Sequence, residues 1–197
     1  MFFRFVCDCR FRNFGFQHFI SAFVFVMEVR SIEAIVRALN GAKVKYLIVG
    51  GLAVVAHGYE RLTNDVDLVI SLKRQNIIRG LRALIDIGYN LKIPVTPEQF
   101  ADPRLREQWR REKNMVVLQL WSDVHRRTPV DVFVYEPFDF QREFSRALRE
   151  PVFGKVPAFI VSYETLLQMK QSAGRGQDLV DIDKLRRLDP HRKKSRP

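Results

Sequence analysis

Cysteine is scarce in this chain of 197 residues, which contains only Cys7 and Cys9. One residue separates them, so they lie too close together to connect distant parts of a fold, and two thiols are too few for a complete zinc site. The sequence therefore argues against a disulfide framework, and a cytoplasmic location fits it best.

Long apolar runs are also missing. After Met27, Arg, Lys, Asp or Glu interrupts every apolar stretch before it reaches the roughly 18 residues that a membrane-spanning helix needs. We therefore expect a soluble protein with no membrane partner. The hydrophobic content of 47% supports a packed core, and the length suits one domain with a short appendage.

Acidic residues are in deficit, with 22 Asp and Glu against 33 Lys and Arg, which gives a formal net charge of +11. Such a charge attracts polyanions, including RNA, DNA and nucleotide phosphates, without selecting among them. Part of the excess lies in residues 189–197, which we expect to be a basic disordered tail.

The first 26 residues differ from the rest of the chain. They contain nine of the 16 phenylalanines, interleaved with arginines, and follow no persistent helical or strand period. No small-residue cleavage site follows their apolar stretch, which argues against a secretory signal. We expect residues 1–26 to be a non-native or disordered extension, with translation starting at Met27.

Beyond Met27 the hydrophobic spacing switches between helical and strand periods. Helices are expected at 27–39, 52–56, 73–87, 140–148, from 163 onward, and at 177–188. Strands are expected at 46–49, 65–70, 115–121 and 130–135, with an extended segment at 152–161 and a loop with some helix at 94–113. This order predicts an α/β (α+β) fold, with a main domain at 27–161 and C-terminal helices at 162–188 packed on it.

Two aspartates carry the first chemical signal. Side chains alternate across a strand, so Asp65 and Asp67 point to the same face and hold their carboxylates close together. Like charges placed this way repel, and a hard divalent cation with oxygen ligands is the usual compensation. Two solvated aspartates at a strand edge are the alternative for an isolated Asp-x-Asp.

Two further features extend that signal. Gly50 and Gly51 stand where a strand turns into a helix, and the exposed backbone N–H groups of such a turn can cradle phosphates. Asp131 opens another apolar strand and can face the same cleft. Three carboxylates with a phosphate cradle suit two-metal phosphoryl or nucleotidyl transfer.

These residues resemble a known family. Gly50-Gly51, thirteen further residues, Asp65-Val66-Asp67 and a later Asp131 on a strand are similar to the signature of the DNA polymerase β-like nucleotidyltransferase superfamily. The runs at 49–67 and 166–182 resemble, more narrowly, the short AbiEii/AbiGii-toxin-like (MNT-like) nucleotidyltransferases. The resemblance implies a nucleotidyltransferase fold, in which helices flank a mixed sheet and a small helical piece follows at the C-terminus.

The resemblance also implies roles for individual residues. Asp65, Asp67 and Asp131 would hold Mg²⁺, with two ions expected, and Asp131 would help activate the acceptor hydroxyl. Lys170 would be catalytic and reach the triphosphate of the NTP substrate. Binding of the nucleotide, or support of the groups that bind it, is implied for Gly50, Gly51, Arg61, Thr63, Lys170, Asp178 and Asp181.

The function that follows is transfer of a nucleoside monophosphate from an NTP to an RNA (tRNA) or protein hydroxyl. A toxin–antitoxin or phage-defence pair, with a cognate antitoxin or toxin protein as partner, is the expected setting. Two alternatives stay open: modification of a small molecule of the aminoglycoside type, and a catalytically silent module that binds nucleotide or a partner. For Lys170, Asp178 and Asp181, a solvated helix face with a salt bridge to Arg175 is the competing interpretation.

Overall fold

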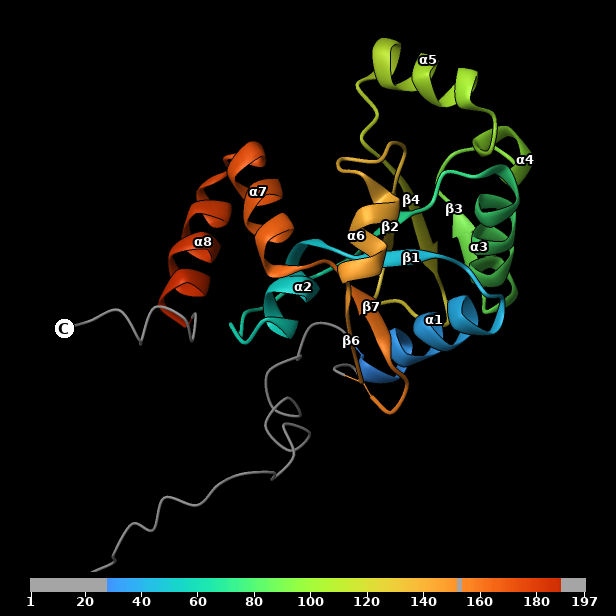
Figure 1. The fold of residues 1–197 in the computed structure, drawn as a ribbon. Coiled ribbons are helices and arrows are strands. Elements are labelled where there is room, and N and C mark those ends of the chain that lie inside the picture. Colours follow the sequence, from blue (N-terminus) through green and yellow to red (C-terminus); the bar gives the residue numbers. More distant parts are fainter. Residues whose placement is uncertain (1–27, 152–153, 189–197) are drawn as a thin grey trace, which may run out of the picture.

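The computed structural model describes residues 28–151 and 154–188. Their centre is a seven-stranded mixed sheet with the strand order β3-β4-β5-β2-β1-β7-β6 (Figure 1). The strands are β1 (Tyr46–Ile48), β2 (Val66–Ile70), β3 (Tyr89–Leu91), β4 (Val117–Ser122), β5 (Val130–Phe133), β6 (Leu148–Glu150) and β7 (Ala158–Ile160). The predicted fold, a mixed sheet flanked by helices, is confirmed.

The three central strands set up the rest of the molecule. β2 runs antiparallel to β1 and parallel to β5, and β4 runs antiparallel to β5. All residues of β1 are buried, and in β2 only Asp67 is not fully buried. Asp67 is thus a charged residue in an otherwise apolar central strand, where a charge is costly unless a partner compensates it.

Helices α1 (Val29–Gly41) and α3 (Arg74–Asp86) pack against one face of the sheet. The apolar residues of α1 recur at helical spacing and are buried at Ile32, Ile35, Val36 and Leu39. Gly80 of α3 lies against Ile70, because a Cβ added to it would be 3.9 Å from the Cδ1 atom of Ile70. Alternation along β2 therefore directs Asp67 to the opposite face, away from α3.

The segment expected to be a loop with some helix is mostly helical. It forms α4 (Pro97–Phe100) and α5 (Pro103–Lys113). Thr96 caps α4 in a capping box with Gln99, and the Asp102 side chain accepts a hydrogen bond from the backbone N–H of Arg104 at the start of α5. Caps and prolines at the first helical positions stabilise these polar helices, which lack a regular apolar spacing. Hydrophobic periodicity therefore underestimated the helical content of this segment.

Two short strands were not predicted. β3 consists of three residues after α3, and β6 starts at Leu148, where the sequence predicted the end of a helix. That helix, α6 (Phe140–Arg146), is capped by Asp139 and ends two residues earlier than expected. Both strands lie at the edges of the sheet.

The C-terminal part is a pair of packed helices, α7 (Tyr163–Ala173) and α8 (Gly176–Leu188). The predicted cap, Ser162, accepts a hydrogen bond from the backbone N–H of Thr165. Figure 1 shows the pair beside α2 (Gly50–Ala56), with which α7 is in contact. The division into domains at 161 stays a prediction.

The predictions for residues 1–26 and 189–197 concern segments outside the described residues. Within 28–151 and 154–188, no helix has the length and apolar character needed to cross a membrane.

Candidate metal centre and active site

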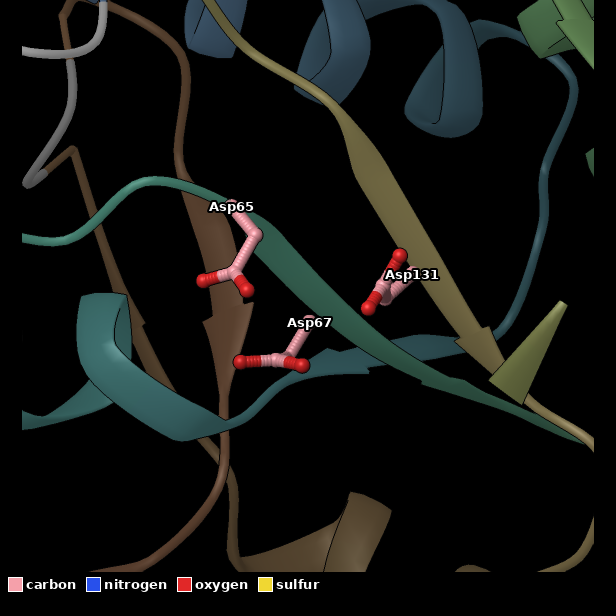
Figure 2. A group of neighbouring side chains, drawn as sticks. All are labelled: Asp65, Asp67 and Asp131. Carbon is pink, nitrogen blue, oxygen red and sulfur yellow. The ribbon is translucent and has the colours of Figure 1, made fainter. Parts of the chain in front are cut away.

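The parallel pairing of β2 and β5 brings the predicted carboxylates together. Asp67 and Asp131 are direct register partners, and Asp65 immediately precedes β2 on the same face. One carboxylate oxygen from each of the three residues can be chosen so that all lie within 4.8 Å of one another. Figure 2 shows the three side chains converging from the two neighbouring strands.

Among the described residues, the three carboxylates have no direct cationic partner. Within the described part of the chain, none of them forms an ion pair with Lys, Arg or His. Burial, reinforced by repulsion from Asp65 and Asp131, raises the pKa of Asp67 to about 7. Burial also raises the pKa of Asp131, with a further increase from Asp65 that a hydrogen bond from Gln119 opposes.

This donor set fits a hard divalent cation. All the ligand atoms are carboxylate oxygens, which Mg²⁺ and similar ions prefer, and their spacing allows a shared ion. A cation would remove the repulsion that raises the pKa of Asp67. The alternative of two solvated aspartates does not hold for Asp67, because this carboxylate is largely buried.

The two glycines make close packing against the carboxylates possible. Gly50 begins α2 with φ +63°, and a Cβ on it would overlap the Oδ2 atom of Asp67. A Cβ on Gly51 would overlap the Oγ1 atom of Thr63 and lie 2.9 Å from the Nη2 atom of Arg61. Side chains at these positions would therefore displace β2 or the residues that precede it.

Thr63 and Arg61 connect this centre to the rest of the cleft. The hydroxyl of the buried Thr63 donates a hydrogen bond of 3.4 Å to Oδ1 of Asp65. Arg61 forms an ion pair of 2.7 Å with Asp181 of α8. Thr63 thus contacts Asp65 directly, whereas Arg61 contacts α8, and the expected roles of both residues stay predictions.

Lys170 occupies a different environment from the one expected for a residue that reaches substrate. Its Nζ atom lies 2.9 Å from Asp178 and 2.7 Å from Asp181, and its side chain is only 6% exposed. Both aspartates are buried as well. The competing interpretation of a solvated face is therefore wrong, although the Arg175–Asp178 salt bridge that it included is present at 2.8 Å.

Paired charges reverse the usual effect of burial on Asp178. Burial alone raises its pKa, but hydrogen bonds from Arg175 and Lys170 outweigh that effect and hold the pKa below its ordinary value. Asp181 accepts further hydrogen bonds from Arg61 and Gln177. We call these residues, Arg61, Lys170, Arg175, Asp178 and Asp181, the hairpin ion cluster.

A cleft of about 950 Å³ joins the two groups of charges. Asp65, Asp67, Asp131 and the glycine pair line one side, and α7 and α8 line another. Sequence reasoning missed an apolar wall of this cleft, which includes Phe133, Tyr135 and Phe138. The signal was available, because alternation from Asp131 places residues 133 and 135 on the same face as the carboxylate.

Arg175 is a further cleft residue that the sequence did not single out for nucleotide binding. It lines the cleft together with Gly50 and Asp67, from the turn between α7 and α8. Its neighbours Gly174 and Gly176 mark this turn in the sequence, but nothing local indicates that it faces the carboxylates.

No family model and no curated protein matches the chain. Among solved structures, the lincosamide antibiotic adenylyltransferase LnuA, in a lincomycin-bound crystal structure, matches with a TM-score of 0.56 and 16% sequence identity, covering 83% of this chain and 99% of the other. An antigenic nucleotidyltransferase-like protein from Paracoccidioides brasiliensis matches with a TM-score of 0.47 and 20% identity, covering 80% and 75%.

The likeness to LnuA establishes the nucleotidyltransferase fold that the sequence resemblance implied. It says nothing about the narrower similarity to AbiEii-like toxins, which stays a prediction. The chain therefore has a nucleotidyltransferase fold in which three carboxylates converge and could hold a metal ion.

Proposed function

We propose that the chain is a metal-dependent nucleotidyltransferase, which transfers a nucleoside monophosphate from an NTP to an acceptor hydroxyl and releases pyrophosphate. The observation that carries this proposal is the convergence of Asp65, Asp67 and Asp131 in a large cleft of a nucleotidyltransferase fold. A chain with no use for a cation would gain nothing from holding three unpaired carboxylates together.

Mg²⁺ is the proposed cofactor, held by Asp65, Asp67 and Asp131, with two ions as the expected number. When bound, it would neutralise charge on the phosphates and favour attack by the acceptor oxygen. The exclusively carboxylate donor set supports this choice over a metal that prefers sulfur or nitrogen.

The residues of the chain then have distinct tasks. Asp65 and Asp67 hold the metal end of the cleft, and Asp131 accepts the proton of the acceptor hydroxyl. Asp131 lies beside Asp67 in the strand pairing and lines the same cleft, which places it where an acceptor hydroxyl could approach. The backbone N–H groups of Gly50 and Gly51, at the start of α2, are proposed to face the phosphates.

For the acceptor, the first candidate is an RNA (tRNA) or protein hydroxyl within a toxin–antitoxin or phage-defence pair. The net charge of +11 supports a polyanionic acceptor, and the sequence resemblance supports the setting.

A small molecule is the second candidate acceptor. The apolar wall of Phe133, Tyr135 and Phe138 beside Asp131 supports it, since such walls are typical of small-molecule sites. LnuA, which shares the fold, acts on lincosamide antibiotics.

The test is to incubate the full chain with each α-labelled NTP and Mg²⁺, adding total tRNA, cell-lysate protein, or a panel of lincosamides and aminoglycosides in separate reactions. The control is the double variant Asp65→Asn/Asp67→Asn. Label that moves to one acceptor class only with intact aspartates supports nucleotidyl transfer and identifies the acceptor. NTP binding without any transfer would favour the catalytically silent module.

A further inference from the structure

Arg61, Lys170 and Arg175 line the cleft. They differ in how many of their hydrogen-bond donors already bind other groups of the protein. Lys170 is 6% exposed and lies within 3 Å of two carboxylates, Asp178 and Asp181. Arg61 is 18% exposed and forms hydrogen bonds with Asp181 and with the backbone oxygen of Leu62. If either side chain turned toward a ligand, the buried Asp181 would lose one of its two cationic partners.

Arg175 is different, because its side chain is 77% exposed. Its Nε atom donates to Oδ2 of Asp178 at 2.8 Å, and Nη2 lies 3.5 Å from Oδ1. Within residues 28–151 and 154–188, Nη1 has no hydrogen-bond partner. A guanidinium can bind oxygen atoms along more than one edge, so the contact with Asp178 leaves the outer edge available.

Arg175 lies in the same cleft as the carboxylates of Asp65, Asp67 and Asp131. It lies in the turn between α7 and α8, where Gly174 ends α7 in the left-handed conformation with φ +63°. In the cleft it shares the lining with Asp67 and Gly50.

We propose that Arg175 is a triphosphate-binding residue of this cleft, and that Lys170 is a positioning residue that acts through Asp178. This inference rests on the proposed function, because it places the metal-bound phosphates between the carboxylates and the turn. The outer edge of Arg175 then takes oxygens of the β- and γ-phosphates, for which a planar guanidinium is well suited. Asp178 fixes the inner edge, and Lys170 fixes Asp178.

The assignment differs from the sequence expectation, in which Lys170 itself reaches the triphosphate. The contacts of Lys170 explain the change. A lysine withdrawn from two buried aspartates would leave each of them with a single cationic partner, whereas Arg175 can bind phosphate without breaking its bond to Asp178.

Competition binding against a fluorescent nucleoside triphosphate tests the proposal on the full chain in Mg²⁺. All four NTPs are compared first, and the tightest is then compared with its diphosphate and monophosphate. The variants are Arg175→Gln, Arg175→Lys and, as the matched control, Lys184→Gln, which removes an exposed cation of α8 that does not line the cleft. Thermal unfolding of each variant accompanies the binding curves.

We expect Arg175→Gln to weaken triphosphate binding about 10- to 100-fold, since hydrogen bonds to charged groups are typically of that size. Arg175→Lys falls between this variant and the wild type, because it retains the charge but not the forked geometry. Monophosphate binding stays within about twofold, as expected if the lost contacts are to the β- and γ-phosphates. Lys184→Gln matches the wild type.

Equal weakening of mono- and triphosphate in Arg175→Gln, or no weakening of either, overturns the role of Arg175 and leaves the proposed function standing. If the wild-type chain binds none of the four NTPs in Mg²⁺, the proposed function is overturned and this inference with it.

Discussion

The two ends of the cleft contain charges that are arranged in opposite ways. At the metal end, Asp65, Asp67 and Asp131 place like charges together, with no ion pair to any described residue. At the other end, each carboxylate of the hairpin ion cluster has at least two cationic partners within 3 Å. The carboxylates are half-buried at the first end and buried at the second, and yet the more buried ones are those that the protein pairs with cations.

The pKa values express this difference. The pKa of Asp67 rises to about 7 because burial and neighbouring carboxylates disfavour its charged form. The pKa of Asp178 lies below its ordinary value because hydrogen bonds from Arg175 and Lys170 outweigh the effect of burial. We infer that the first group is completed by a ligand, whereas the second is completed by the protein and holds α7 and α8 together.

The largest expected effect comes from removing charge at the metal end. Asp67→Asn should lower nucleotidyl transfer by about 10²-fold or more, which is typical for loss of a group that stabilises transition-state charge. The same substitution should raise the melting temperature of the metal-free chain, because it relieves repulsion. Rate assays and metal-free thermal unfolding measure the two effects. A variant that is less stable than the wild type without metal would break the comparison.

Removing charge at the other end should have the opposite effect on stability. Lys170→Met leaves Asp178 and Asp181 without their shared buried cation, and we expect a loss of about 3 kcal/mol in the free energy of unfolding. Urea unfolding measures it, with Lys184→Met as the control on the exposed face of α8. A loss no larger than that of the control would mean that the hairpin ion cluster does not hold the helices.

A smaller effect is expected at the glycine pair. Gly51→Ala should cost about 1 kcal/mol or more, because its Cβ would overlap the Oγ1 atom of Thr63, the residue that contacts Asp65. Gly41→Ala is the control, since a Cβ there meets nothing within 4 Å. Urea unfolding and Mg²⁺ affinity should both change in Gly51→Ala. Equal stability and affinity in the two variants would contradict the close packing described for this turn.

The most gradual effect is on pH dependence, and the two ends should differ in sign. Asp67 has a raised folded-state pKa, so its contribution makes the metal-free chain less stable as the pH rises from about 4 to about 7. Asp178 has a lowered pKa, so its contribution is present above the ordinary aspartate range and is lost as the pH falls through the folded-state value. Melting temperatures of the wild type and of Asp67→Asn are measured from pH 4 to pH 8. The difference between the two proteins at each pH gives the contribution of Asp67. A constant difference would contradict it.

The sequence predicted much of this site because its signals are local. Asp65 and Asp67 follow from strand alternation, Gly50 and Gly51 from a strand-to-helix turn, and the cap at Ser162 from short-range chemistry. Each of these features depends on residues that are near one another in the chain.

The parts that were missed depend on contacts between distant segments. The ion pair of Arg61 with Asp181 joins residues 120 positions apart, and the direction of Arg175 depends on how the whole α7–α8 pair docks beside α2. The short strand β3 has no room for a periodic pattern, and helix α5 is held by its cap rather than by an apolar face. Periodicity has little to detect in such elements.

The central claim is that the carboxylate end of the cleft, and not the hairpin ion cluster, takes the cation. Crystals of the full chain soaked with Mn²⁺ and a non-hydrolysable NTP, recorded for anomalous scattering, test it most directly. The account predicts anomalous peaks among Asp65, Asp67 and Asp131 that disappear in Asp65→Asn/Asp67→Asn. Anomalous density at Asp178 and Asp181, or none at the three carboxylates of the wild type, would contradict it.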